Sequence, residues 1–230
     1  MTTCPTEPID FLDQLLNARF SCRAFKPDPV PQETIDRLLM AAQRTPSWCN
    51  SQPWQVLITG GAGTEKLRQL LVDAARSNPQ NTSDFAFPRE YSGVYNDRRK
   101  ESGFQLYNVL GIARGDKAAY ARQMLENFRF FGAPHVAIIT TDEALGVYGA
   151  VDCGGYVGNF LLAAQALGLG AIAQAALASR SATLREHFDL PPERRVVCGI
   201  SFGFADPEHK ANSFRTSRAS LEAAVRFVAD

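Results

Sequence analysis

The segment RTPSWCNSQPWQVLIT, residues 44–59, joins a helical pattern to an aliphatic strand. It holds two prolines, two tryptophans and a cluster of Ser, Asn and Gln side chains. Because each proline fixes its own φ angle, the segment is too rigid to be a casual loop. Trp54, which adjoins the strand, is expected to anchor the core, whereas Trp48 is expected to lie outside it.

Regular patterns surround this segment. Residues 9–19 predict a short helix with Ile9, Leu12 and Leu16 on one stripe. A second helix opens at Pro31 and ends before Pro46, since proline suits the first helical position and blocks helix interiors. After the strand, GGAG at residues 60–63 predicts a turn, and residues 64–77 predict a helix with its leucines, Leu70 included, facing inward.

The rest of the chain alternates helices and strands. Residues 77–105 are polar, aromatic and rich in arginine, and predict an irregular or helical excursion on the surface. The further elements predicted are helices at about 116–130, 152–170 and 181–190, strands at 135–141 and 195–205, and a short strand and loop at 171–178. A polar, weakly helical extension begins at about residue 207. This order favours one α+β domain over residues 1–230, with its most apolar helix packed on a sheet.

Composition excludes several classes of protein. The 24 basic and 24 acidic residues cancel, so we expect no nucleic-acid partner, and no apolar run approaches the length of a membrane span. The first residues, MTTCPTEPIDFLDQ, do not resemble a secretion signal. The five cysteines and three histidines are dispersed without ligand spacing, which predicts no metal site and reduced thiols in the cytoplasm.

Three local patterns are decoys. GGAGTEK lacks the GxxxxGK[ST] spacing of a phosphate-binding loop, and a plain strand–helix turn is the better interpretation. GGYVG, residues 154–158, lacks the first GxG of a dinucleotide motif, so its glycines favour close helix packing. Cys49 and Cys153 have no cysteine or histidine beside them and are interpreted as buried apolar thiols.

Two arginine clusters lie near opposite ends of the chain. RFSCR spans residues 19–23, and NSFRTSR spans residues 212–218. Each mixes guanidinium groups with hydroxyl or amide side chains outside regular structure. A guanidinium forms strong charge-assisted hydrogen bonds with phosphate oxygens, to which hydroxyl groups add neutral donors. Either cluster alone could equally be a solvated surface group.

Taken in order, five motifs resemble the FMN-dependent nitroreductase family: ARFSCRAF, TPSWCNSQPW, FFGAP, GLGAIAQAALA and NSFRTSR. The resemblance extends from Ile9 to about Leu221 and is nearest to the nitrobenzoate-type branch. It implies an α+β fold with a mixed sheet flanked by helices, in an intertwined homodimer. Each of the two FMN sites would then be built from both subunits.

The resemblance also implies the residues that hold FMN. Arg19, Ser21 and Arg23, with the backbone of Phe20, would bind the phosphate and ribityl chain, and Arg215 and Arg218 would share the phosphate. Many relatives have a lysine where this chain has Thr216, which leaves more of the phosphate charge to the arginines. The residues implied near the flavin ring are Asn127, Gln174 and Ala175 from one subunit and Pro46, Ser47, Trp48 and Asn50 from the other. A proline-braced loop would present such groups with little entropy lost on binding.

The function implied is an enzyme in which NADH or NADPH reduces FMN, and a nitroaromatic, nitrobenzoate-like or quinone acceptor then takes a hydride in a ping-pong cycle. No catalytic side chain is required, because the cofactor performs the redox chemistry. Candidates for the substrate pocket are aromatic residues and arginines, although composition alone favours a structural role for each: Phe85, Phe87, Tyr91, Tyr95, Phe130, Phe131, Arg89, Arg98 and Arg99.

Two alternatives stay open. The same flavin scaffold could perform reductive dehalogenation, flavin fragmentation or a dehydrogenation, with residues 77–105 deciding between them. A protein that binds flavin without catalysis, as a carrier or sensor, is a third possibility.

Overall fold

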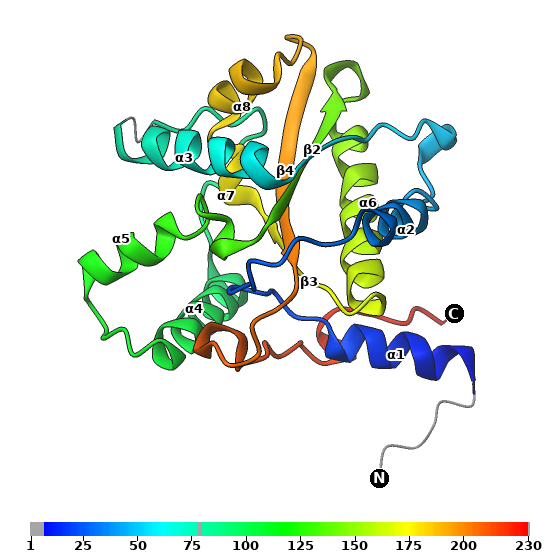
Figure 1. Cartoon of the computed structure of the whole chain (residues 1–230). Coiled ribbons are helices and arrows are strands. Elements are labelled where there is room, and N and C mark those ends of the chain that lie inside the picture. Colours follow the sequence, from blue (N-terminus) through cyan, green and yellow to red (C-terminus); the bar gives the residue numbers. More distant parts are fainter. Residues whose placement is uncertain (1–6, 78–79, 230) are drawn as a thin grey trace.

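A four-stranded sheet lies at the centre of the computed structural model, which describes residues 7–77 and 80–229 (Figure 1). The strands are β1 (Gln55–Thr59), β2 (His135–Asp142), β3 (Gly170–Gln174) and β4 (Arg194–Gly203), in the order β1-β2-β4-β3. Every neighbouring pair is antiparallel. The α+β class is confirmed, but the predicted mixed sheet is wrong for these strands, because all their pairings are antiparallel. The parallel pairing of Ser21 with Ala171 is an isolated bridge outside the four strands.

Both faces of the sheet are covered by helices (Figure 1). Helices α2 (Gln32–Ala42) and α6 (Gly146–Ala166) pack on one face, and α3 (Gly61–Ser77), α7 (Ala175–Ala178) and α8 (Ser181–Phe188) on the other. Alternate side chains of β2 supply the two cores: Val136 and Ile138 join α3, α7 and α8, whereas Ala137 and Ile139 join α2 and α6. A strand buried on both faces reads as one continuous apolar run, which explains the pattern HVAIITT.

The most apolar helix, α6, lies close against the sheet as predicted. A Cβ atom on Gly149 would lie 2.6 Å from Oγ1 of Thr141 in β2, so a larger residue would force helix and strand apart. Cys153, Tyr156 and Phe160 of the same helix are buried. The small residues of the sequence therefore serve close packing.

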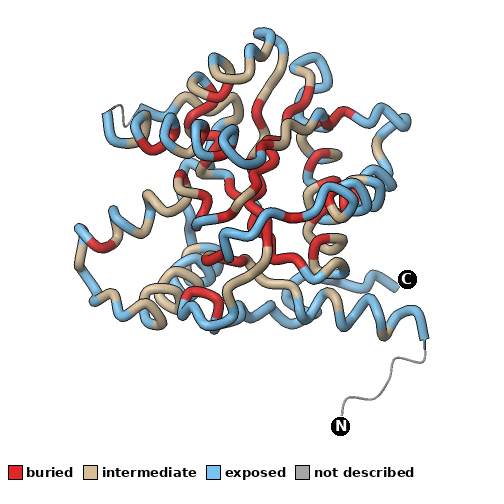
Figure 2. Tube along the Cα trace, viewed as in Figure 1, coloured by how far each residue is buried: buried red, intermediate tan, exposed pale blue. Residues whose placement is uncertain are grey.

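Three further helices lie outside this sandwich: α1 (Pro8–Ala18), α4 (Gly93–Val109) and α5 (Lys117–Leu125). Figure 2 shows that the buried residues follow the sheet and the inner helix faces, while α1 is largely exposed. The apolar stripe predicted for α1 exists but is not buried in this chain, since Ile9, Leu12 and Leu16 are 54%, 41% and 48% exposed. The excursion at 77–105 contains most of α4, and its residues 78 and 79 lie outside the described part.

Four predicted boundaries or elements were wrong. Helix α3 begins within GGAG, because Gly61 (φ +51°) adopts a conformation that turns the strand directly into the helix, and Leu70 is 37% exposed. Helix α6 begins at Gly146, before the predicted residue 152. Helix α5 ends at Leu125, and the chain then turns through a 3₁₀ turn at Phe130–Gly132. From residue 207 to 229 the chain shows only 3₁₀ turns and extended or irregular backbone.

The rigid segment at 44–54 is a strained loop. Cys49, Asn50 and Gln52 have positive φ angles of 50°, 54° and 48°, and the Ser47 hydroxyl accepts a hydrogen bond of 2.9 Å from the Gln52 N–H. Such conformations persist only where the surrounding structure holds them. Cys49 is exposed, so its interpretation as a buried thiol is wrong, whereas Cys153 is buried as expected.

The two tryptophans of this loop differ as predicted. Trp54 is 6% exposed, donates from Nε1 to Gln43 and stacks on Tyr156. Trp48 is 57% exposed, and its ring meets that of Tyr148 of α6 edge-on at 4.2 Å.

Among the described residues, no helix is both long and apolar enough to cross a membrane. Of the five cysteines in the sequence, Cys4 lies outside the described residues.

Candidate cofactor-binding site

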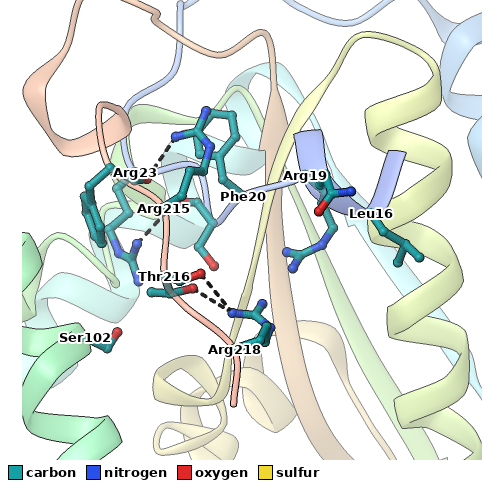
Figure 3. Close-up of a pocket in the computed structure, with 11 residues that line it drawn as sticks. Leu16, Arg19, Phe20, Arg23, Ser102, Arg215, Thr216 and Arg218 are labelled. Carbon is teal, nitrogen blue, oxygen red and sulfur yellow. Dashed lines mark hydrogen bonds between the residues drawn. The ribbon is translucent and has the colours of Figure 1, made fainter. Parts of the chain in front are cut away.

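The two arginine clusters, distant in sequence, lie side by side. Residues 24–26 pair with residues 204–206: the Lys26 N–H donates to the Phe204 carbonyl at 2.8 Å, and the Asp206 N–H donates to the Ala24 carbonyl at 3.0 Å. These bonds hold the segment after α1 against the segment after β4. The end of α1 and the C-terminal segment consequently border the same cavity (Figure 3).

That cavity has a volume of about 280 Å³. It is lined by Leu16, Asn17, Arg19, Phe20, Ser21, Arg23, Ser102, Phe214, Arg215, Thr216 and Arg218. Figure 3 shows arginine side chains from both segments gathered around it. We call it the arginine cavity.

Among residues 7–77 and 80–229, no carboxylate forms an ion pair with any of the four arginines of this cavity. The guanidinium groups of Arg23, Arg215 and Arg218 donate to neutral oxygens instead. Arg215 donates to the carbonyl of Asn212 at 2.8 Å, and Arg218 donates to the hydroxyl of Thr216 at 2.9 Å. Because guanidinium groups carry a permanent charge, the cavity presents a concentration of positive charge that suits an anion such as phosphate.

Burial and mutual repulsion act on these groups. Burial lowers the pKa of Arg23 and of Arg19, and the charge of Arg218 lowers the pKa of Arg19 further. Since an arginine side chain keeps its proton in proteins, the groups respond by favouring a negative ligand rather than by losing charge.

Two phenylalanines fix the orientation of two arginines in a reciprocal manner. Arg215 of the C-terminal segment lies over the ring of Phe20, with Cζ 3.9 Å from its centroid. Arg23 of the N-terminal segment lies over the ring of Phe214 at 6.0 Å. Each segment therefore supplies a ring to the cation of the other segment.

A second cavity, of about 270 Å³, adjoins the first through Arg23, which lines both. Its other lining residues are Leu106, Tyr107, Gln123, Met124, Asn127, Phe131, Ile172, Ala173, Gln174, Ala175 and Ala176. The Gln174 side chain donates to the Asn127 carbonyl at 2.9 Å and bonds the Ser201 hydroxyl through Oε1. Gln174 is 3% exposed, so this network holds it in one orientation.

The structure brings together most of the residues that the sequence singled out, in two groups. Around the arginine cavity lie Arg19, Phe20, Ser21, Arg23, Arg215 and Arg218. Around the second cavity lie Asn127, Gln174 and Ala175.

The remaining predicted residues, Pro46, Ser47, Trp48 and Asn50, line neither cavity. Their loop lies against α6 instead, where the Trp48 N–H donates to the Asp152 carboxylate at 3.1 Å. In Figure 1 it is found beyond α2, away from α1. One chain alone does not assemble the full set.

Among the aromatic candidates for a substrate pocket, Phe131 lines the second cavity, but Phe130 is fully buried and cannot contact a substrate. The aromatic residues Phe85, Phe87, Tyr91 and Tyr95 line neither cavity, nor do Arg89, Arg98 and Arg99.

Sequence reasoning missed several lining residues, notably Asn17, Ser102 and Tyr107. Ser102 and Tyr107 belong to α4, which has no buried residue and therefore no clear periodic pattern to orient its faces. Only the tertiary contact between α4 and the C-terminal segment, where Ser217 donates to Glu101 at 3.1 Å, places them at the cavities.

The fold and these cavities define an α+β protein with a positively charged site assembled from both ends of the chain. The nitroreductase family model matches residues 16–204, and the chain belongs to this family. The predicted family resemblance and the nitroreductase fold are thereby confirmed.

Several relatives are similar over nearly their whole length. Nitroreductase NfnB of Mycolicibacterium smegmatis is 37% identical over 98% of this chain and 97% of its own. A 4-nitrobenzoate reductase of Pseudomonas putida is 30% identical over 95% of this chain and 96% of its own. The crystal structure of FMN-dependent NfnB from Mycobacterium smegmatis in complex with NADPH superposes with a TM-score of 0.92 at 34% identity, covering 97% of this chain and 100% of that one.

Proposed function

We propose that this chain is an FMN-dependent oxidoreductase that uses NADPH or NADH to reduce nitroaromatic compounds, nitrobenzoate-like acceptors and quinones included. One observation carries the proposal: four arginines from opposite chain ends, none with a carboxylate partner among the described residues, surround one cavity. Relatives named as nitroreductases or nitrobenzoate reductases support the reaction. Similar solved structures are those of FMN-dependent nitroreductases, one of them in complex with NADPH, and these support the choice of cofactors.

The residues of the two cavities fit FMN. A phosphate monoester suits the guanidinium groups of Arg19, Arg215 and Arg218, with the Ser21 hydroxyl as a neutral donor. A flat ring with polar edges suits the second cavity, where Asn127, Gln174 and Ala175 lie among apolar side chains. When bound, FMN supplies the two-electron chemistry that connects the nicotinamide with the acceptor.

The protein's own residues bind and orient the reactants. Arg23 lines both cavities, so its charge acts on the anionic groups of a ligand that spans them. Gln174 donates to the Asn127 carbonyl and accepts from the Ser201 hydroxyl, and these bonds fix the polar edge of the second cavity before any ligand binds. We assign no side chain a proton-transfer role.

The proposal includes a homodimer. Large apolar side chains are exposed on two neighbouring helices and on the rigid loop: Ile9, Phe11, Leu12 and Leu16 of α1, Val147, Tyr148 and Val151 of α6, and Trp48. A second copy packed on this surface would remove it from water. It would also bring Pro46, Ser47, Trp48 and Asn50 of one copy to the cavities of the other, as the family resemblance implies.

We also propose that the protein acts in the cytoplasm. The four described cysteines are free thiols, which suits a reducing compartment.

The proposed function is tested by steady-state turnover of the FMN-loaded protein with 4-nitrobenzoate and NADPH, then with NADH. We expect oxidation of the nicotinamide that depends on the nitro compound. No turnover of nitroaromatics, together with activity on a halogenated phenol, would support the dehalogenase alternative. Flavin that binds but is not reduced by either nicotinamide would support a carrier or sensor.

A further inference from the structure

We propose that Asn212 is a positioning residue that holds the two arginine segments together and so gives this protein its preference for a phosphorylated flavin. The inference rests on the proposed function. Asn212 does not line the arginine cavity, so it acts through Arg23 and Arg215 rather than by touching the ligand.

The Asn212 side chain bonds to backbone groups of both segments. It is 5% exposed. Its Oδ1 accepts from the Arg23 N–H at 2.8 Å, and its Nδ2 donates to the Ala24 carbonyl at 2.9 Å and to the Asp206 carbonyl at 2.8 Å. One amide thus connects the backbone beside the first cluster with the backbone that leads to the second.

The backbone of Asn212 extends this connection to a guanidinium. Its carbonyl oxygen accepts from Nη1 of Arg215 at 2.8 Å, and its N–H donates to the His209 carbonyl at 2.9 Å. Asn212 therefore contacts Arg23 on one side and Arg215 on the other. These are also the two arginines that stack on Phe214 and Phe20.

Only an amide meets these demands. The position needs one acceptor for an N–H and two donors for two carbonyl oxygens, all fixed in space. An aspartate would place a carboxylate oxygen against carbonyl oxygens. An alanine would remove the side-chain partner of the Arg23 N–H and of the Asp206 carbonyl, while the Ala24 carbonyl would keep its bond from the Asp206 N–H. Either change leaves the two arginine clusters less firmly fixed relative to each other. The second cavity keeps its own hydrogen bonds between Gln174 and Asn127.

The test compares two flavins that differ only in the phosphate. The dissociation constants of FMN and riboflavin are measured by flavin fluorescence titration with the wild-type chain, Asn212→Ala and Asn212→Asp. We expect both variants to bind FMN at least about tenfold more weakly, about 1.4 kcal/mol, while riboflavin binding changes much less. The preference for FMN over riboflavin is a readout that general destabilisation does not move.

Thr64→Val is the matched control. Thr64 is 1% exposed and bonds to Thr59 and to the Pro134 carbonyl, so this variant also loses buried hydrogen bonds but lies outside both cavities. It should lower the thermal midpoint without changing the preference for FMN. Equal loss of both flavins in Asn212→Ala, or no loss of either, would overturn the assignment.

A measurement on the wild-type chain keeps the inference testable if the variants fail to fold. Hydrogen exchange of the Arg23 backbone amide should be slow before flavin is added, because this N–H already donates a hydrogen bond to Oδ1 of Asn212. Rapid exchange would overturn the inference. A wild-type chain that binds neither flavin would refute the proposed function itself. If the wild-type chain prefers FMN to riboflavin and Asn212→Ala shows the same preference, only the role of Asn212 is refuted.

Discussion

The guanidinium of Arg215 lies 3.9 Å from the centre of the Phe20 ring, although the two residues belong to opposite ends of the chain. A guanidinium stacked on a ring keeps its N–H groups in a plane parallel to the ring, where they can reach an anion. When the two chain ends come together in the fold, Phe20 therefore orients the charged group of Arg215 in the cavity. This explains why an aromatic residue lies within the first arginine cluster.

Replacing Phe20 with leucine should weaken FMN binding while leaving the fold intact, because leucine keeps the apolar volume and loses the ring. A cation–π contact contributes about 0.5–2 kcal/mol, so the dissociation constant of FMN should rise roughly 2- to 30-fold. Phe188→Leu, which changes a partly buried ring packed against the core and away from both cavities, is the control. An FMN affinity unchanged in Phe20→Leu would show that the stacking does not orient Arg215.

Removal of Arg218 or Arg19 should each weaken FMN binding by roughly 10- to 100-fold, the range for a hydrogen bond to a charged group. The affinity of both variants should also depend less on salt concentration than that of the wild-type chain. Titration calorimetry at two ionic strengths measures both effects. Arg37→Ala, which removes an exposed arginine of α2, should behave like wild type. Full flavin occupancy in both Arg19→Ala and Arg218→Ala would refute the phosphate assignment.

His135 should make the flavin-free protein less stable in acid. Nε2 accepts from the Val30 N–H at 3.0 Å, so the ring is neutral in the folded chain, with Nδ1 facing the Thr59 carbonyl. Burial lowers the pKa of His135, although the bond to Thr59 opposes the shift.

An unfolded histidine takes up a proton near pH 6.5 and the folded one only at lower pH. The unfolded state therefore binds more protons between these values, and the free energy of unfolding should fall as the pH drops from about 6.5 towards the folded pKa. His187, whose pKa is lowered by burial and by Lys66, adds to the same trend. Urea unfolding at pH 7.5 and 5.5 should give a smaller drop for His135→Asn than for wild type; an identical drop would contradict this role.

Glutamate in place of Val151 should prevent dimer formation. Val151 is 62% exposed on α6 and belongs to the apolar surface that a second copy would cover. A charge buried there without a partner is costly, so sedimentation velocity should report a monomer with reduced flavin retention. Leu70→Glu, at a 37% exposed position of α3, should remain dimeric. A wild-type chain that sediments as a monomer would refute the homodimer.

The fold was predictable where periodicity was strong. The run at 135–141 and the small-residue helix are confirmed, since burial on both sides of a strand and close packing on a sheet leave clear patterns. The apolar stripe of α1 was predicted, but its exposure was not, because sequence does not reveal whether an apolar face packs within its own chain. The turn expected at GGAG failed because Gly61 starts the helix directly.

The gathering of the arginines was predictable from the motifs, but the contacts that hold them in place were not. Arg19, Arg23, Arg215 and Arg218 were singled out together, and the structure places them around one cavity. The sequence indicated Asn212 only as a member of the second arginine cluster. Its role could not be predicted, because the three backbone groups that its side chain bonds to come close to it only in the folded chain. The roles of Pro46 and its neighbours remain a prediction, as their partners lie on another copy in the proposed dimer.

The visible spectrum of the purified protein, loaded with FMN under anaerobic conditions, tests the central claim most directly. NADPH should bleach the yellow flavin band, and 4-nitrobenzoate added afterwards should restore it. A protein that takes up no flavin, or whose flavin band persists with both NADPH and NADH, would contradict the account.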